Sequence, residues 1–424
     1  MSVGKTTEGN QARTNGVEDL ATVLDLLRFG HARTRPELAQ LSGLSRAAVT
    51  QQLDQLLELG LVTEGGLVRS GGGRAPRSLA FCANAGILLV AELDAASMTA
   101  GVTDLAGRLL TQHEEPFNVG EGPDEALKQL AELFDVLLKE SGVPRESVWG
   151  AGLGLPGPVE FSTGRSTSPP IMPGWHAYPV RQQLERRLGL TVWVDNDVNL
   201  MILGELRSGR ARSEQNVVFL NIGSGIGAAI VSGGNLYRGT QGCAGEIGHV
   251  VVSEASDVVC RCGKLGCLEA LAGGAALARD GAVAAESGRS PYLATVVAGG
   301  RAVTAEEITN GTQRGDAVCQ ELVLQCGRLV GKVLATIVNF FNPQLILIGG
   351  ILAGAGDILL AGVRESVYRY SLPIAARDLQ ISLSPLGDEA GMRGAAAMVT
   401  DEFFAPSQMA QWIGRGSPAV AAGD

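Results

Sequence analysis

The first apolar side chains of the chain recur three or four positions apart, which is the spacing of a helix with one buried face. Within residues 19–29 these side chains are Leu20, Val23, Leu24 and Leu27. The pattern predicts an amphipathic helix that ends near Gly30, because glycine commonly stops a helix. The polar residues 1–18 lack such a pattern, and we expect them to form a disordered arm.

Two further helices and a hairpin are expected before residue 80. Thr34 is a candidate N-cap for a helix over residues 36–41, and Ser45 is a candidate N-cap for a helix that reaches about residue 59. Residues 61–63 and 67–68 are short apolar runs on either side of a Gly-Gly pair. They predict two short strands that form a hairpin.

This order of elements over residues 19–80 is that of a winged helix-turn-helix domain, whose second helix enters the major groove of DNA. The stretch 69–77 behind the expected wing has three arginines and no acid, so it suits a tether to phosphates or the minor groove. The residues expected to contact DNA are Ser45, Arg46, Thr50, Gln51, Gln52, Arg69, Arg74 and Arg77. Ordinary helix packing followed by a flexible linker is the alternative interpretation.

From about residue 83 the pattern changes to apolar strands that alternate with amphipathic helices. Strands are predicted over 87–93, 99–103, 108–111, 148–153, 191–194, 217–222, 228–231 and 345–348, and helices over 124–140, 180–188, 320–341 and 388–403. A strand hairpin followed by a helix and a strand occurs twice in this order. The repetition predicts two similar α/β lobes with a ligand cleft between them.

Composition and charge narrow the class of protein. With 45% hydrophobic residues in 424, the chain can bury a sizeable core and is not wholly disordered. We expect a soluble cytoplasmic protein, because it has neither an apolar run of about 20 residues nor the apolar centre of a secretion signal. The net charge is −10, but residues 1–80 have nine Lys and Arg against eight Asp and Glu. Nucleic-acid contact is therefore expected of this first part alone.

The most specific chemical pattern lies in residues 246–269. It places His249 shortly before Cys260, Cys262 and Cys267, and two glycines allow tight turns between the cysteines. One imidazole and three thiols make the four ligands of a closed, structural Zn²⁺ site. A catalytic zinc is less favoured because no coordination position stays open, and three merely buried cysteines are the remaining alternative.

Together these motifs resemble the ROK family of repressors and sugar kinases, over about residues 20–399. The matching segments are Glu246–Glu269 with its zinc motif, Gly154–Pro158, Ser168–Trp175, Asp195–Asn199 and Asn342–Gly350. The resemblance implies an actin-like, duplicated ribonuclease-H-like pair of lobes. It also implies that the helix at 388–403 returns to the first lobe. The expected domains are the arm 1–18, the winged head 19–80, lobe 1 (83–195 plus 388–403), lobe 2 (196–387) and a disordered tail 404–424.

The resemblance also implies a sugar site. The residues expected to contact the sugar are Asn196, Asp197, Glu246, His249 and Glu269. Carboxylates, an amide and an imidazole suit a ring of hydroxyls that both donate and accept hydrogen bonds. In family kinases the aspartate at the position of Asp197 is the base for the attacking hydroxyl. His249 would then present one ring nitrogen to zinc and the other to the sugar.

One segment departs from the kinase pattern. Family kinases have an Asp-x-Gly-Gly-Thr-Lys loop against the ATP phosphates, whereas this chain has Glu92-Leu-Asp94-Ala-Ala-Ser97. The glycines, threonine and lysine are replaced, and the added carboxylates repel phosphate. ATP binding is therefore not expected, although the glycine turns at 223–227 and 349–350 persist.

The sequence thus predicts a sugar-responsive transcriptional regulator, most simply a repressor of carbohydrate-metabolism genes. The expected partners are operator DNA, a sugar or sugar-phosphate effector, and further copies of the chain in a homodimer or homotetramer, without a membrane. The alternative function is that of an ATP-dependent sugar kinase in which Asp197 is the catalytic base. A regulator whose effector is a phosphotransferase-system protein is a third hypothesis.

Overall fold

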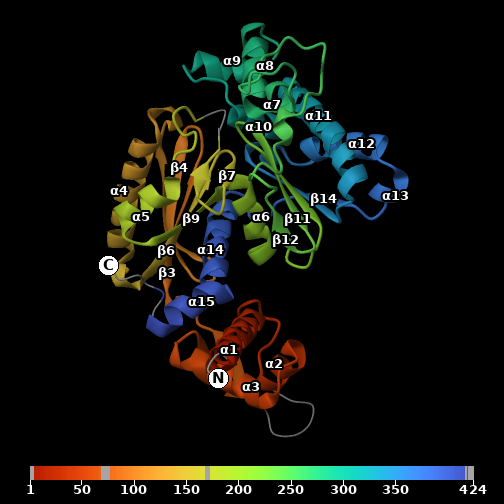
Figure 1. The fold of residues 1–424 in the computed structure, drawn as a ribbon. Coiled ribbons are helices and arrows are strands. Elements are labelled where there is room, and N and C mark those ends of the chain that lie inside the picture. The colour runs from red at the N-terminus through yellow and green to blue at the C-terminus, as the bar shows by residue number, and fades with distance from the viewer. Residues whose placement is uncertain (1–3, 68–76, 168–171, 416–417, 419–424) are drawn as a thin grey trace.

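The computed structural model describes residues 4–67, 77–167, 172–415 and 418 of the chain. A small N-terminal head lies beneath two α/β lobes, and helix α14 (Glu389–Phe404) runs between the lobes toward the head (Figure 1). In this part of the chain no helix is long and apolar enough to span a lipid bilayer.

Three helices build the head, as the sequence predicts: α1 (Gly4–Arg28), α2 (Arg35–Ser42) and α3 (Arg46–Glu58). The Thr34 side chain accepts a hydrogen bond from the Glu37 amide, and the Ser45 side chain accepts one from the Ala48 amide. Both expected N-caps are therefore confirmed. Gly43 has a φ of 71° between α2 and α3, a left-handed conformation that favours glycine and turns the chain into the second helix.

The disordered arm expected over residues 1–18 is wrong for its helical part, because α1 begins at Gly4. Residues 4–18 contain no proline, and several of them are good helix formers. The helix can therefore continue backward from its packed second half, in which Leu20, Val23 and Leu24 are buried. Polarity alone does not separate an exposed helix from a disordered arm.

The expected wing is also wrong in its pairing. Strand β1 (Val62–Leu67) pairs antiparallel with β2 (Arg77–Phe81), and the register shifts between Glu64 and Leu67. Gly65 and the residue after it therefore lie inside a bulged strand and do not form the hairpin turn. A Cβ at Gly65 would overlap the Ser78 hydroxyl, so glycine permits this close approach. The arginine-rich stretch falls between the two wing strands in sequence, and residues 68–76 lie outside the described part.

Each lobe is built on a five-stranded sheet with the same order. In lobe 1 the order is β5-β4-β3-β6-β9, and in lobe 2 it is β12-β11-β10-β13-β14. Three antiparallel strands are followed by two parallel ones in both sheets. This repeat confirms the duplicated, actin-like and ribonuclease-H-like α/β fold predicted from the sequence.

The bounds of these strands follow the predicted apolar runs. In lobe 1 they are β3 (Ile87–Leu93), β4 (Ser97–Asp104), β5 (Leu109–Pro116), β6 (Val148–Leu155) and β9 (Thr191–Asn196), with the short pair β7 (Val159–Glu160) and β8 (Arg165–Ser166). In lobe 2 they are β10 (Val217–Ile222), β11 (Ile226–Ser232), β12 (Asn235–Tyr237), β13 (Leu345–Gly349) and β14 (Gln380–Leu383).

Helices cover both faces of each sheet. Lobe 1 packs α4 (Pro123–Ser141) and α5 (Val180–Leu188) on one face of its sheet, and α14 contacts β3 and β6 (Figure 1). Lobe 2 packs its largest helices, α11 (Ala317–Phe341) and α12 (Asp357–Tyr370), against its own core. The smaller helices of lobe 2 are α7 (Leu268–Ala272), α8 (Gly274–Glu286), α9 (Pro291–Ala298), α10 (Ala305–Gln313) and α13 (Pro373–Ala376).

Helix α6 (Asp197–Ser208) joins the two lobes. It contacts β10 and β11 of lobe 2 on one side and α14 on the other. A Cβ at Gly394 would overlap the carbonyl oxygen of Leu200, and one at Gly204 would overlap that of Ala390. The backbones of α6 and α14 are therefore in direct contact, and the two helices form one rigid unit between the sheets.

The expected disordered tail over residues 404–424 is wrong at its start. Phe404 ends α14, and α15 (Pro406–Trp412) follows and contacts α1 of the head. Trp412 is buried and its indole nitrogen donates to the Phe403 carbonyl 2.8 Å away. The aromatic side chain supplies the apolar area that orders this short helix. Residues 416–417 and 419–424 lie outside the described part.

Candidate functional site

The candidate site begins at Asn196, the last residue of β9, and Asp197, the first residue of α6. The Asn196 side chain caps α6 by accepting hydrogen bonds from the amides of Val198 and Asn199. Its amide nitrogen donates to the Asp197 carboxylate at 2.8 Å and to the Gly157 carbonyl at 3.1 Å. These contacts hold the Asp197 side chain at the start of α6. This point lies beside Gly154, near the end of β6.

The electrostatic surroundings of Asp197 are acidic. Its pKa is raised from 3.8 to about 7, chiefly by burial and also by the carboxylates of Asp94 and Glu246, against the lowering effect of the hydrogen bond from the Val198 amide. Burial and the charges of Asp197 and Asp94 also raise the pKa of Glu92 well above its usual value. Carboxyl groups of both lobes therefore interact with Asp197: those of Glu92 and Asp94 from lobe 1 and that of Glu246 from lobe 2.

Glu246, His249 and Glu269 approach this point from lobe 2. Burial raises the pKa of Glu246, the charge of His249 lowers it and that of Glu269 raises it again. The Glu269 carboxylate accepts a hydrogen bond from the Ile226 amide at 3.1 Å and occupies the space where Gly225 has no Cβ. The structure thus brings together carboxylates, an amide and an imidazole, the donor and acceptor set expected for a sugar.

The predicted metal ligands also come together. Those ligand atoms lie within 4.8 Å of one another, and the residues are His249, Cys260, Cys262 and Cys267. Backbone bonds close the loop: the Cys260 amide donates to the Lys264 carbonyl at 2.8 Å, and the Gly263 amide donates to the Cys260 carbonyl at 2.9 Å. Gly263 has a φ of 86° and Gly266 one of 68°, so both turns favour glycine.

The spacing of these atoms fits a tetrahedral ion. Sulfur ligands about 2.3 Å and a nitrogen ligand about 2.05 Å from a zinc centre stand about 3.75 Å and 3.55 Å apart at tetrahedral angles. The Cys262 and Cys267 sulfurs are 3.7 Å apart, and the Cys260 sulfur is 3.5 Å from His249 Nδ1. The other ring nitrogen, Nε2, lies 3.8 Å from Glu246 Oε2. The cluster can therefore hold a metal while His249 also faces the polar cleft.

The altered hairpin contacts the second glycine turn, that of residues 223–227. Asp94 is at the tip between β3 and β4, and its carboxylate accepts a hydrogen bond from the Ser224 hydroxyl at 3.4 Å. The Glu92 carboxylate lies directly over Gly391 at the start of α14, where a Cβ would overlap it. The place of the missing phosphate loop is therefore filled by side chains of both lobes.

An interlobe ion pair beside the site was missed by the sequence reasoning. Arg238 follows β12 in lobe 2, and its Nε lies 2.7 Å from an oxygen of the buried Asp195 in lobe 1. The guanidinium also stacks 3.9 Å from the centre of the Phe161 ring. A single arginine after a short strand carries no motif. Only the buried aspartate immediately before Asn196 could have drawn attention to it.

In the head, the structure shows which of the residues predicted to contact DNA are exposed. Ser45, Arg46, Thr50 and Gln51 are exposed at the N-terminal half of α3. Gln52 is not available, because it is only 5% exposed and lies on the buried face with Val49 and Leu53. Helical spacing places it three residues after Val49, so its polarity was misleading.

The basic residues of the wing divide into described and undescribed ones. Arg77 is exposed on β2 and forms an ion pair with Glu64 at 3.2 Å, and Arg35 at the start of α2 pairs with the same carboxylate at 2.8 Å. Glu64 thus joins α2 to the wing, and Arg77 keeps part of its charge exposed. Arg69 and Arg74 lie outside the described residues.

The chain is similar to regulators over its whole length and to kinases over its body alone. It is 30% identical to a putative xylose repressor from Caldicellulosiruptor sp. (strain Rt8B.4), over 94% of this chain and 98% of the relative. Its structure matches that of a ROK family transcriptional regulator described as a homologue of the Escherichia coli MLC protein, with a TM-score of 0.80 and 25% identity over 93% and 98% of the two chains. A ROK family glucokinase from Streptomyces griseus in complex with glucose and AMPPNP matches with a TM-score of 0.66 and 27% identity, over 74% of this chain and 99% of the other.

The kinase match leaves about a quarter of the present chain uncovered, whereas the regulator matches cover it almost completely. The family model of the ROK family matches residues 92–402, which include most of lobe 1, all of lobe 2 and the whole candidate site. The chain belongs to the ROK family.

Proposed function

We propose that this protein is a sugar-responsive transcriptional repressor. The observation that carries the proposal is that one polypeptide chain contains both a winged helix-turn-helix head and a ROK body. Relatives that share both parts are named as repressors or regulators, and the glucokinases match about 70–74% of this chain. We place the protein in the cytoplasm, where operator DNA and sugars meet.

The head binds operator DNA through α3. Arg46, Thr50 and Gln51 lie exposed near the helix N-terminus, which is the end that commonly reaches base edges in this type of domain. Asp54 and Glu58 are exposed farther along the same helix, so the acidic half stays away from the phosphates. Arg69, Arg74 and Arg77 of the wing region supply phosphate or minor-groove contacts.

A sugar or sugar-phosphate effector binds between the lobes. The carboxylates of Asp197, Glu246 and Glu269 accept hydrogen bonds from sugar hydroxyls, and the His249 ring fixes the orientation of the sugar, while Asn196 holds the Asp197 carboxylate in place. Because Asp197 begins the helix that joins the two lobes and packs against α14 of lobe 1, whereas Glu246, His249 and Glu269 lie in the body of lobe 2, the sugar binds one relative arrangement of the lobes more tightly than another. That difference in affinity biases operator binding by the heads of a homodimer or homotetramer.

The His249 and cysteine cluster holds a structural zinc ion in this proposal. Zn²⁺ suits three thiolates and one imidazole, and its four protein ligands leave no position for catalysis. The ion would keep the loop around Cys260 and Cys267 folded. His249 would thereby keep its Nε2 turned toward Glu246 and the sugar.

A sugar kinase is the second candidate function, and one observation favours it. The pKa of Asp197 near 7 suits a general base at neutral pH. The hairpin opposes it, because the Asp94 carboxylate binds Ser224 where phosphate would have to pass. The charge of the Asp94 carboxylate at this position repels a triphosphate.

The test begins with DNA fragments that the purified full-length chain selects from a random-sequence library. We expect gel shifts with a palindromic consensus, and no shift by a folded sample would overturn the proposal. A coupled ADP-release assay with D-glucose and D-xylose addresses the alternative. Turnover that disappears in Asp197→Asn would establish the kinase.

A further inference from the structure

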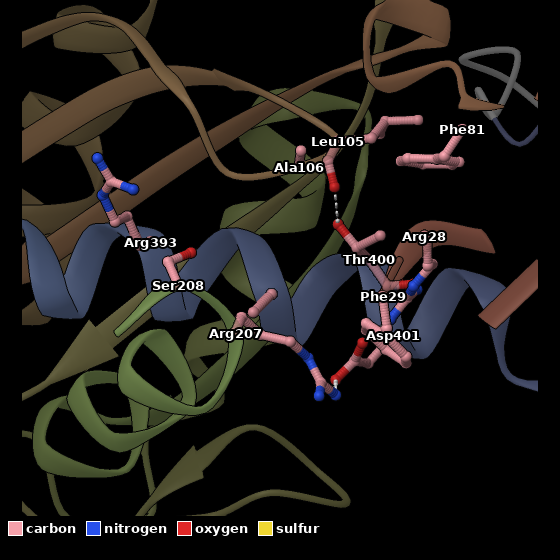
Figure 2. A pocket seen from close by; sticks show the side chains of 11 residues that line it. Arg28, Phe29, Phe81, Leu105, Ala106, Arg207, Ser208, Arg393, Thr400 and Asp401 are labelled. Atoms are coloured by element: carbon pink, nitrogen blue, oxygen red, sulfur yellow. Dashed lines mark hydrogen bonds and ion pairs between the residues drawn. The ribbon is translucent and has the colours of Figure 1, made fainter. Parts of the chain in front are cut away.

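The head and the body meet around a small charged hollow of about 80 Å³ that the proposed function does not explain. Figure 2 shows its lining residues, which come from the end of α1, from β2, from the turn after β4, and from α6 and α14. Three of them are arginines, Arg28, Arg207 and Arg393, and one is an aspartate, Asp401. The hollow is therefore a junction of head, α6 and α14.

Asp401 on α14 binds both the head and α6 through ion pairs. One of its carboxylate oxygens accepts from Arg28 at the end of α1, and the other accepts from Arg207 at the end of α6. The Arg28 side chain is only 5% exposed and also donates to the Thr400 carbonyl at 3.3 Å. Arg28 also pairs with Asp25 at 3.4 Å, whereas the side chains of Asp401 and Arg207 remain 29% and 33% exposed. Asp401 is therefore the group that connects the buried arginine of the head to α6.

Phe29 adds a second link at the same point. The Arg28 guanidinium carbon lies 4.5 Å from the centre of the Phe29 ring, and that of Arg207 lies 4.4 Å from it. Both distances are within the range of cation–π attraction. The head therefore contacts the end of α6 in two ways. The Phe29 ring contacts Arg207 directly, and the Asp401 carboxylate of α14 binds both Arg28 and Arg207.

Helix α6 connects this junction to the candidate sugar site. It begins at Asp197, capped by Asn196, and Arg207 is in its last turn. Its 12 residues span about 18 Å at about 1.5 Å per residue. The backbones of α6 and α14 are in direct contact at Gly204 and Gly394. Asp197 at the start of α6 is thus connected to Arg207 through its own helix and to Asp401 through α14.

We propose that the Arg28–Asp401–Arg207 network, with Phe29, transmits sugar binding from the start of α6 to the DNA-binding head. This inference rests on the proposed function and adds the route of its regulation. The residues concerned are positioning residues, since none of them lies in the sugar site or on the exposed face of α3. Replacing Arg207, the residue through which α6 joins the network, should leave sugar binding in place and uncouple it from the head.

The test uses the full chain and two readouts, with D-xylose and D-glucose as probes. Calorimetry measures sugar affinity, and hydrogen–deuterium exchange measures the response of peptides from α1 and α2. The same library-selected DNA gives the ratio of operator affinities with and without sugar. We expect wild type to show a ratio of about 5-fold or more, which is typical of allosteric coupling.

The deciding variant is Arg207→Gln, and Arg393→Gln is its matched control. Arg393 lines the same hollow, but its ion-pair partner Glu389 lies on its own helix. We expect Arg207→Gln to bind sugar with wild-type affinity and to lose the exchange response and the affinity ratio, while Arg393→Gln keeps both. If Arg207→Gln fails to fold, Arg207→Lys keeps the charge but lacks the planar fork, and its ratio should fall toward one.

The outcomes separate the two proposals. Wild type that binds neither probe sugar nor DNA overturns the proposed function and this inference with it. A responsive wild type whose ratio is unchanged in Arg207→Gln and in Asp401→Asn overturns this inference alone. Equal loss of response in Arg393→Gln would also overturn it, because the effect would then be one of general surface charge.

Discussion

Replacing Asp197 by Asn should stabilise the protein and weaken sugar binding at the same time. The charge on this half-buried carboxylate is destabilising in the fold, because desolvation and neighbouring acids raise the pKa of Asp197 to about 7. Asn keeps an oxygen that can accept from the Val198 amide, which lies 2.9 Å from the carboxylate, and removes the charge. The substitution therefore relieves a cost that the protein tolerates for its ligand.

The magnitude follows from the pKa values. Raising the pKa from 3.8 to about 7, at about 1.4 kcal/mol per pH unit, makes ionisation in the fold cost about 4 kcal/mol. Water reaches part of this half-buried side chain, so we expect about 2 kcal/mol. The unfolded chain loses its proton near pH 3.8 and the folded chain near pH 7. Stability therefore falls as the pH rises between these values and is constant above them.

Urea unfolding of both proteins at pH 5 and pH 8 measures this effect. The advantage of Asp197→Asn should grow by about 1 kcal/mol or more between the two pH values, because the wild-type carboxylate ionises in that window. Calorimetry should show sugar affinity lower by about 10-fold or more, the usual worth of a hydrogen bond to a charged group. An advantage that is constant or shrinks with pH, or unchanged sugar affinity, would refute the reasoning.

Two further predictions concern the metal cluster and the head. Cys260→Ser or Cys262→Ser should remove stoichiometric zinc, measured by elemental analysis, and should impair the sugar response through His249. The control variant Cys243→Ser, at an exposed cysteine, should keep both zinc and the sugar response. Full zinc occupancy in both ligand variants would show that the ligands are misassigned. Arg46→Ala should weaken operator binding and reduce its salt dependence while sugar affinity stays unchanged, and Arg74→Ala should act likewise. Loss of both functions together would mean that the domains are wrongly placed.

Local signals in the sequence predicted the elements whose folding is decided locally. The caps Thr34 and Ser45, the turn at Gly43 and the continuous apolar strands of both sheets lie as expected, because each depends on a few neighbouring residues. The metal cluster could also be predicted from the sequence, because closely spaced cysteines around glycines are rarely a packing solution. These parts of the fold and site needed no knowledge of distant contacts.

The elements that were missed depend on distant partners. Helix α6 is buried against both the lobe 2 sheet and α14, so Leu200 and Ile202 are buried on different sides and no single apolar stripe marks it. Helix α15 has few buried residues and is ordered by Trp412, which contacts the head and α14 region. The Asp195–Arg238 pair joins residues 43 positions apart in different lobes. Such pairings arise from topology and leave no local pattern.

The most direct test of the account is the affinity of the full-length protein for its selected DNA with and without sugar, measured by fluorescence anisotropy. The account predicts that at least one small sugar changes the DNA dissociation constant by about 5-fold or more, and that Asp197→Asn no longer responds at the same concentration. DNA affinity that is indifferent to every sugar tested, in a protein that phosphorylates one of them, would contradict it.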